Sequence, residues 1–563
     1  MADESHVVRG IQWREAFPFT NLFRTFRIAI HPSKLVLGLL ALLSLYIGGW
    51  VLDAVWPAQH LAVPGEIVQY QQHTDRMEGR SFGEASAEAR EQIEDQYAAR
   101  LIDAGIEKDP VKAAEKAAKG EHQDDLLKKI EDLHRENLKN IDSKRTNDLK
   151  SADSITDEKQ KEKTKDDIET AYRQDRRLAW NQYLAELEAV DAINGSGVFE
   201  EFFEYQVSQV DGVVAGVLEW NWLGGAGLAS AGVVPSIIRF FTVGPVWLLC
   251  EHTVYAILFA ILFLIVWSVF GGAIARIAAV HVARDEKISV RQALRFSIGK
   301  LLSFVFAPII PLLIVLGVGL VVAVVAIIGN IHYIGPIVVG AAFFLALIAG
   351  FVMALVMLGT AGGFNLMYPT IAVEGSDSFD AISRSFSYVY ARPWRMLFYT
   401  AVAIVYGSLT YLFVRLFVWL MFTLTHFFVS IGMRVNAENG AELWDSMWAS
   451  PSSPWKLTYD IPWAMLDWGQ ATGAWLLAFW NFLTIGMVGA FAISFYFCAN
   501  TIIYYLMRHE VDATELDDVF LEQSDEEIVE SVSVTTATVE TAEKPAETQS
   551  EEASSGSSPG AGA

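Results

Sequence analysis

Six long apolar stretches decide what this chain can fold into. Each has more than 20 residues, which as a helix rising about 1.5 Å per residue crosses the roughly 30 Å hydrocarbon core of a bilayer. A single soluble core has no need of apolar runs of this length. We therefore predict an all-α, polytopic membrane protein with about six transmembrane helices. The predicted spans are residues 35–55, 246–275, 301–328, 336–358, 396–428 and 476–506.

Lysine and arginine residues flank these spans in a pattern that gives the chain a direction. Arg27 and Lys34 precede the first span, and further cations follow the second span from Arg276 onward and the fourth span. Because cytoplasmic loops carry an excess of Lys and Arg, we expect both termini in the cytoplasm of a bacterial plasma (inner) membrane, with residues 56–245 outside it. The cations expected at lipid headgroups or the interface are Arg284, Lys287, Arg291, Arg295, Lys300, Arg384, Arg392 and Arg395.

The sequence between and after the spans divides into regions of different composition. The net charge of −24 is concentrated in the polar segment after the first span (roughly −9) and in the tail (roughly −14). This acidic balance argues against nucleic acid as a partner. The predicted regions are a cytoplasmic N-terminal segment (1–34), the first transmembrane helix (35–55), an extracytoplasmic helical domain (56–197), an amphipathic membrane-associated segment (198–245), a five-helix transmembrane domain (246–508) with an internal repeat (246–328 and 336–428), and a disordered acidic cytoplasmic tail (509–563).

Two predicted helices, residues 124–150 and 157–193, form a coiled-coil-like hairpin in the extracytoplasmic domain. Leu126 and Ile130 begin one thin apolar stripe, and Tyr172 belongs to the other. Thin stripes leave two interpretations open: a solvated helical hairpin, or a coiled coil that pairs with a partner or with a second copy of the chain. The segment that follows, residues 198–244, is interpreted as a surface-lying helix and a re-entry segment that leads back into the bilayer. Its polar face is anionic, which is not the usual pattern of a surface-seeking helix and favours packing on the helix bundle.

A short amphipathic pattern occurs twice, each time between two spans. The copies are SVRQALRFS (289–297) and DSFDAISRS (377–385). Ser289 and Asp377 are typical N-capping residues, and Ser289 with Gln292 has the spacing of a capping box. We therefore expect two short helices, each with one apolar edge, at the cytoplasmic membrane surface.

The second copy and the residues after it resemble a known group of proteins. They are similar to a bacterial membrane-domain superfamily that includes the glycerophosphodiester phosphodiesterase membrane domain and related integral membrane families of uncharacterised function. The resemblance extends over about residues 246–507 and implies an integral membrane module with cytoplasmic amphipathic helices. It does not imply phosphodiesterase activity, because the soluble domain is not present, and the helical insertion at 66–197 departs from it. The matching residues are Ala381, Ile382, Ser385, Phe386, Pro393, Trp394 and Arg395, with Ala293, Leu294 and Ser297 in the first copy.

No motif for catalysis stands out in the sequence. It contains no phosphate-binding Gly loop followed by Lys-Ser/Thr, no HExxH and no CxxC, so we expect no enzymatic activity, no cofactor and no metal site. Cys250 and Cys498 both lie in apolar stretches, which predicts free thiols. Ionisable residues within membrane segments are functional by default, and those of interest here are Glu251, His252 and Arg415.

Each of these three residues also has a structural interpretation. Glu251 and His252 can form an interfacial pair that hydrates the end of a helix. Arg415 lies about 30 Å along a helix from Arg395, where its side chain can snorkel to the outer interface. Residues 416–433 would then bend along the outer surface.

Together these features favour a scaffold or assembly partner over an enzyme. The extracytoplasmic helices and the acidic tail offer surfaces to other molecules. The expected partners are membrane lipids, other membrane or extracytoplasmic proteins, and a second copy of the chain as a homo-oligomer. A transporter or transport-accessory subunit is the main alternative, since Pro308 and Pro311 predict a kink in the third span. A lipid-interacting membrane module is a third interpretation.

Overall fold

The computed structural model describes residues 17–57, 61–76, 82–117, 121–155, 157–191, 197–224, 231–434 and 468–520, and a few positions between 444 and 466. Its regular elements are helices, as the sequence predicts. Seven helices in the described part are long and apolar enough to cross a membrane, so the chain is a polytopic membrane protein. They are α3 (Pro32–Val55), α10 (Val233–Glu251), α11 continuing into α12 (Thr253–Arg284), α14 (Leu301–Ala326), α15 (Ile334–Glu374), α17 (Pro393–Arg434) and α19 (Trp468–Asp512).

The helix that the sequence analysis did not count is α10. Its residues 233–245 lie in the predicted amphipathic segment 198–245, and its last six residues are the first residues of the predicted span 246–275. The cause is a break at His252, where φ of −123° and ψ of 48° end α10 and allow α11 (Thr253–Val266) to begin. The predicted second span therefore runs over 253–284 instead, through α11, η4 (Trp267–Gly271) and α12 (Gly272–Arg284).

An antiparallel hairpin joins α10 to α9 (Val198–Leu218), the predicted amphipathic helix. Gln206 Nε2 donates to the Phe240 carbonyl at 3.1 Å, and Gly212 lies against Ser236, so the two helices run in opposite directions. The hairpin starts at the end of α3, where Asp53 accepts hydrogen bonds from the first turn of α9. The chain enters and leaves the hairpin at the same end, as expected for a segment that turns back on itself. α9 packs against α3 and α10, as its anionic polar face favours.

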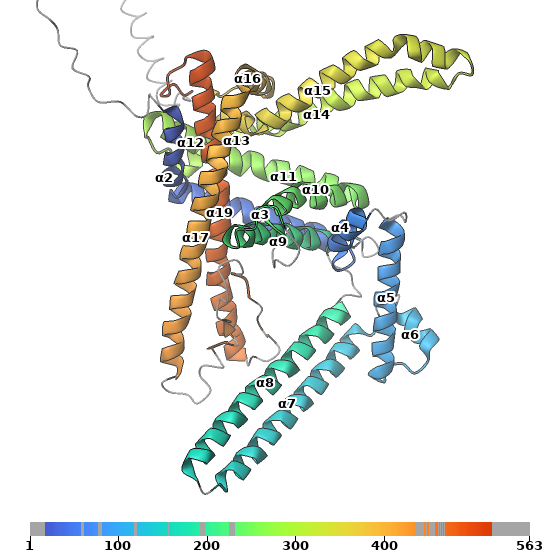
Figure 1. The fold of residues 1–563 in the computed structure, drawn as a ribbon, viewed down its shortest axis with the longest axis vertical. Coiled ribbons are helices and arrows are strands. Elements are labelled where there is room, and N and C mark those ends of the chain that lie inside the picture. The colour runs from blue at the N-terminus through green and yellow to red at the C-terminus, as the bar shows by residue number, and fades with distance from the viewer. Residues whose placement is uncertain are drawn as a thin grey trace, which may run out of the picture.

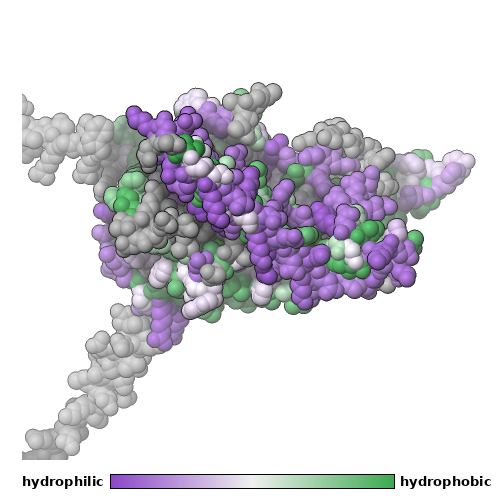
Figure 2. Space-filling view, turned by 90° about the horizontal axis from the view of Figure 1, so that it is seen from below, coloured by the Kyte–Doolittle hydropathy of each residue, from purple (hydrophilic) through white to green (hydrophobic). Residues whose placement is uncertain are grey.

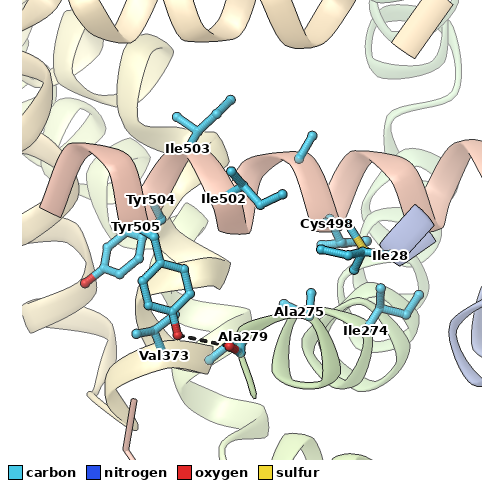
Figure 3. Packing of buried hydrophobic residues seen from close by; sticks show 14 of the residues in the cluster. Ile28, Ile274, Ala275, Ala279, Val373, Cys498, Ile502, Ile503, Tyr504 and Tyr505 are labelled. Carbon is cyan, nitrogen blue, oxygen red and sulfur yellow. Dashed lines mark hydrogen bonds between the residues drawn. The ribbon is translucent and has the colours of Figure 1, made fainter. Parts of the chain in front are cut away.

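Helix ends from across the chain meet in one buried cluster, which we call the hub. It joins α2 (Thr25–Ala29), α12, the end of α15, α16 (Ser378–Ala391) and the second half of α19. Figure 3 shows Ala275 of α12 facing α19, and the Tyr505 hydroxyl of α19 donates to the Ala279 carbonyl at 3.1 Å. Both alanines are fully buried. Because small residues on α12 let α19 approach closely, two distant segments share this core.

Three groups of helices extend from the hub in different directions (Figure 1). The first is the hairpin of α14 and α15, the second combines α3 with α9, α10 and α11, and the third is the pair α17 and α19. In the first group the two helices pack on each other, but no residue in the most apolar window of either helix is buried. The apolar side chains in these two windows are therefore exposed on the surface of the molecule.

Two helices continue where the sequence predicts a change. α15 runs unbroken through residues 359–363, beyond the end of the predicted span 336–358. Gly359 faces Phe386 of α16, where an added Cβ would lie only 2.9 Å from the ring, so this glycine allows close packing rather than ending the helix. α17 is one helix through residues 416–433, and the predicted bend along the outer surface is wrong. Its second half instead packs in a cluster with Trp444 and Trp448.

The polar domain contains α4 (Glu66–Arg76), α5 (Phe82–Asp103), α6 (Pro110–Ala117), α7 (Gln123–Asp153) and α8 (Glu158–Asp191). The predicted hairpin is present as α7 and α8, which project together from the rest of the molecule (Figure 1). Figure 2 shows that hydrophilic residues predominate on the face seen from below, the side toward which this hairpin points in Figure 1.

Part of the predicted tail belongs to the hub. α19 continues to Asp512, and the Phe520 amide donates to the Val373 carbonyl at 2.8 Å. Residues 509–520, predicted to be disordered, are therefore structured. Residues 521–563, like residues 1–16, lie outside the described part of the chain.

Candidate functional site

A buried carboxylate lies where the polar domain meets the membrane helices. Glu66, in the first turn of α4, is only 4% exposed. It accepts hydrogen bonds from the Val63 amide at 2.7 Å and from Trp247 Nε1 at 3.2 Å. His252 Nε2 lies 3.4 Å from Glu66 Oε1. The structure thus brings His252 to Glu66, whereas Glu251, its predicted companion, is exposed.

Opposing effects act on the pKa of Glu66. Burial raises the pKa, whereas the interaction with His252 and the hydrogen bonds from Val63 and Trp247 lower it, and the lowering effects prevail. The pKa lies below the usual value of 4.5, so the carboxylate is charged at neutral pH. Glu66 therefore holds the turn between α10 and α11 against α4.

Arg415 is buried rather than extended to a surface. It is 6% exposed, its Nη2 lies 2.5 Å from Asp211 Oδ1, and its Nη1 donates to the Tyr411 hydroxyl at 3.2 Å. Asp211 belongs to α9, so the ion pair joins the second group of helices to the third. Arg415 thus has a protein carboxylate as its counter-charge, which the snorkelling interpretation did not include.

A cavity of about 880 Å³ lies beside Asp211, between α3 and α9. Asp53 fixes the corner where these helices meet. Its carboxylate accepts hydrogen bonds from the Phe199 amide at 3.0 Å and from the Tyr255 hydroxyl at 2.6 Å, which ties α3 and α9 to α11. The sequence analysis missed this cavity because its walls come from distant segments, and no local motif marks either wall.

The predicted interface cations fall into two groups. Arg384 and Arg395 pair with acidic side chains of the protein: Arg384 Nε lies 2.9 Å from Glu374 and 3.0 Å from Asp380, and Arg395 pairs with Glu510. The others surround the hub in exposed or half-buried positions and are Arg284, Lys287, Arg291, Arg295, Lys300 and Arg392.

Two cations that look like flanking charges in the sequence are inside the hub. Arg276 is 5% exposed and donates to the carbonyls of Ala372 at 2.8 Å and Phe520 at 2.7 Å. Lys34 is fully buried, and its Nζ has no hydrogen-bond partner among the described residues. A positive charge beside an apolar run indicates the side of the membrane but not the depth of the side chain, so the sequence could not identify these two.

Both repeated amphipathic helices are present with their predicted caps. α13 (Val290–Gly299) begins with a complete capping box between Ser289 and Gln292, and α16 begins where Asp377 accepts a hydrogen bond from the Asp380 amide at 2.9 Å. The apolar edges of both helices face the protein core. The repeated small residues and serines are all buried: Ala293 and Ser297 in α13, and Ala381 and Ser385 in α16.

Within the described residues, no group of three or more His, Cys, Asp or Glu side chains could hold a metal ion. The buried charges instead connect helices to one another, and the cavity and the projecting hairpins are the surfaces left for other molecules. Function has to be inferred from these features, because no family model, curated protein or solved structure matches the chain.

Proposed function

We propose that this polytopic membrane protein is a non-enzymatic scaffold or assembly partner in a bacterial plasma membrane. The observation that carries the proposal is the arm formed by α7 and α8, which projects from the membrane helices (Figure 1). In this proposal both termini are cytoplasmic and residues 56–245, which include the arm, are outside.

The arm is long and is fixed at one end. Its helices have 31 and 34 residues, or about 45–50 Å at 1.5 Å per residue. At the base, Leu126 and Tyr183 pack with Tyr97 of α5 in a small buried cluster. Toward the tip, ion pairs connect the helices instead, with Arg145 2.6 Å from Glu169. An arm that presents surface without enclosing a cavity suits the binding of another protein better than the binding of a small substrate.

The test is to shorten the arm without disturbing its base. Deleting residues 141–174 and closing the gap with a four-residue Gly/Ser turn removes the distal half and keeps the cluster around Tyr97. A photo-crosslinking amino acid at Leu133 or Leu178, which are 52% and 56% exposed, should give discrete adducts in native membranes with the full arm. The shortened protein should lose them while still inserting into the membrane. The absence of discrete adducts from the full arm would contradict the scaffold role, and unchanged adducts in the shortened protein would place the contact on the retained half of the arm.

A transport-accessory role is the second function that we consider, on the basis of the α9–α10 hairpin. Asp211 on this hairpin pairs with Arg415 on α17, which places an ion pair between apolar helices. If the pair lies on a transport path, Asp211→Asn should change flux through reconstituted vesicles, whereas the exposed control Glu136→Gln should not. No flux with either protein over a broad substrate panel would exclude the transporter.

A lipid-interacting role has support from the cations around the hub, including Arg284, Arg291 and Arg295, which are exposed. Cations on short surface helices attract anionic headgroups at about 1 kcal/mol each. This attraction would seat the hub on the membrane in either of the other roles.

A further inference from the structure

We propose that the cavity between α3 and α9 binds an organic ammonium group carried on an apolar body. This inference goes beyond the scaffold role and does not depend on it. The cavity of about 880 Å³ is within the size range of small-molecule sites. Its lining combines free carboxylates, aromatic rings and aliphatic side chains, and each of these selects a different part of the ligand.

Two carboxylates supply the negative charge. Glu200 and Glu204 lie one turn apart on α9, line the cavity, and are exposed. Their side chains have no hydrogen-bond or ion-pair partner among the described residues. The other lining acids are committed, since Asp53 caps α9 and Asp211 pairs with Arg415. Because the described lining contains no Lys or Arg, the two free carboxylates make the cavity attractive to a cation.

Aromatic side chains form the wall next to these carboxylates. The rings of Tyr46 and Phe203 pack edge to face with centroids 5.6 Å apart, and Phe199 stacks on Phe203 at 5.5 Å. Trp50, one turn along α3 from Tyr46, is 64% exposed. Ring faces attract organic cations, with Trp the strongest, and they are the usual means of recognising quaternary ammonium groups. A hydrated metal ion gains little from such a wall, so the aromatic groups favour an organic ammonium over an inorganic cation.

The remaining lining suits the apolar part of the ligand. Ala54, Leu61 and Val207 add aliphatic surface, and α3 is one of the helices apolar enough to cross a membrane. An ammonium group between the carboxylates and Trp50 would therefore leave its hydrocarbon portion against α3. Two sources share this chemistry: the headgroup of an amine-bearing lipid, and a free amphiphilic amine.

Binding can be measured on the full-length protein in dodecyl maltoside micelles with radiolabelled dodecyltrimethylammonium as the probe. The wild type should bind the probe saturably, and 2,2-dimethyltetradecane, in which a neutral carbon replaces the ammonium nitrogen, should not compete. The double variant Glu200→Gln/Glu204→Gln should weaken Kd about tenfold because it removes both charges, and Trp50→Ala should weaken it about fivefold. The matched control is Glu136→Gln/Glu162→Gln, which removes two exposed carboxylates from the arm and should leave Kd unchanged.

Competition then identifies the source. Displacement of the probe by phosphatidylethanolamine but not by phosphatidylglycerol assigns the site to a lipid headgroup, and displacement by neither assigns it to a free amine. Wild-type protein without saturable binding would overturn the proposal. So would equal binding by the wild type and the Glu200/Glu204 variant, provided that both proteins unfold at the same temperature.

Discussion

Glu66 illustrates, at the scale of single residues, how a charge can hold distant segments together. Its carboxylate accepts hydrogen bonds from Val63 and Trp247 and faces His252, so it connects α4 to the turn between two membrane helices. Buried donors without an acceptor are costly, and this site has several donors around one acceptor. The sequence analysis singled out His252 but not Glu66, because Glu66 looks like any acidic residue at the start of a polar helix.

Removing the Glu66 carboxylate should loosen this junction. Glu66→Ala leaves Trp247 and the Val63 amide without their acceptor and should cost about 2 kcal/mol of local stability. Amide hydrogen exchange in α4 should then become roughly thirtyfold faster. The control is Glu91→Ala, which removes an exposed carboxylate from α5. Equal exchange rates in α4 for the Glu66 variant and wild type would contradict the prediction.

The charge of Glu66 also predicts a pH dependence. Because its pKa is lower in the folded protein than the usual 4.5, the charged form contributes stability that is fully present above that usual value. The contribution is lost as the pH falls through the lowered pKa. Exchange in α4 of wild type and Glu66→Gln should therefore differ at about pH 5.5 and converge as the pH falls well below 4.5. A difference that grows on acidification would show that the sign is wrong.

The Arg415–Asp211 pair should behave as a coupled unit. Arg415→Met or Asp211→Leu alone leaves a partner charge among apolar helices, and each should lower stability by about 2–3 kcal/mol. The double variant should lose less than the sum of the two, because no charge is then left unpaired. Thermal unfolding in micelles measures all three proteins. Additive losses would show that the two side chains do not interact.

At the scale of elements, the sequence predicts best what is decided locally. The caps of α13 and α16 were predictable because Ser289 and Asp377 bond to amides only three residues away. The continuation of α15 past residue 358 was not, because the packing of Gly359 against Phe386 of α16 joins two separate helices and has no local sequence signal. The break at His252 likewise depends on contacts with Glu66 that no local pattern shows.

Cap removal should act on one element at a time. Ser289→Ala and Asp377→Ala should each cost about 1 kcal/mol and speed amide exchange in the first turn of α13 or α16, respectively. Asp377→Ser, which keeps a capping oxygen, serves as the matched control. Faster exchange in both helices from either single change would mean that the caps are not local.

At the scale of the whole molecule, the α9–α10 hairpin determines how many times the chain changes sides. Since the hairpin is antiparallel, its extra apolar helix does not alter the direction of the following spans. The six-span prediction with both ends on one side is therefore compatible with seven apolar helices. The sequence predicted most of the long apolar helices, but not the different directions of the three helix groups, which depend on packing at the hub.

Cysteine labelling on intact cells tests this arrangement. In a Cys250→Ser/Cys498→Ala background, a cysteine at Asn137 on the arm should react with a membrane-impermeant maleimide. Cysteines at Glu286, between α12 and α13, and at Glu515, near the end of the described chain, should react only after permeabilisation. Labelling of Glu286 from outside, or protection of Asn137, would reverse or break the topology.

The α14–α15 hairpin has a mechanical consequence. α16 packs against α15 near Gly359, Gly362 and Gly363. The preceding part of α15, from Ile334 onward, has contacts mainly with α14. The free part is about 37 Å long at 1.5 Å per residue and behaves as a cantilever clamped at one end. If a change in bilayer thickness tilted the free end, the load would fall on the contact between α15 and α16, where Gly359 faces Phe386 and Gly363 faces Ser385.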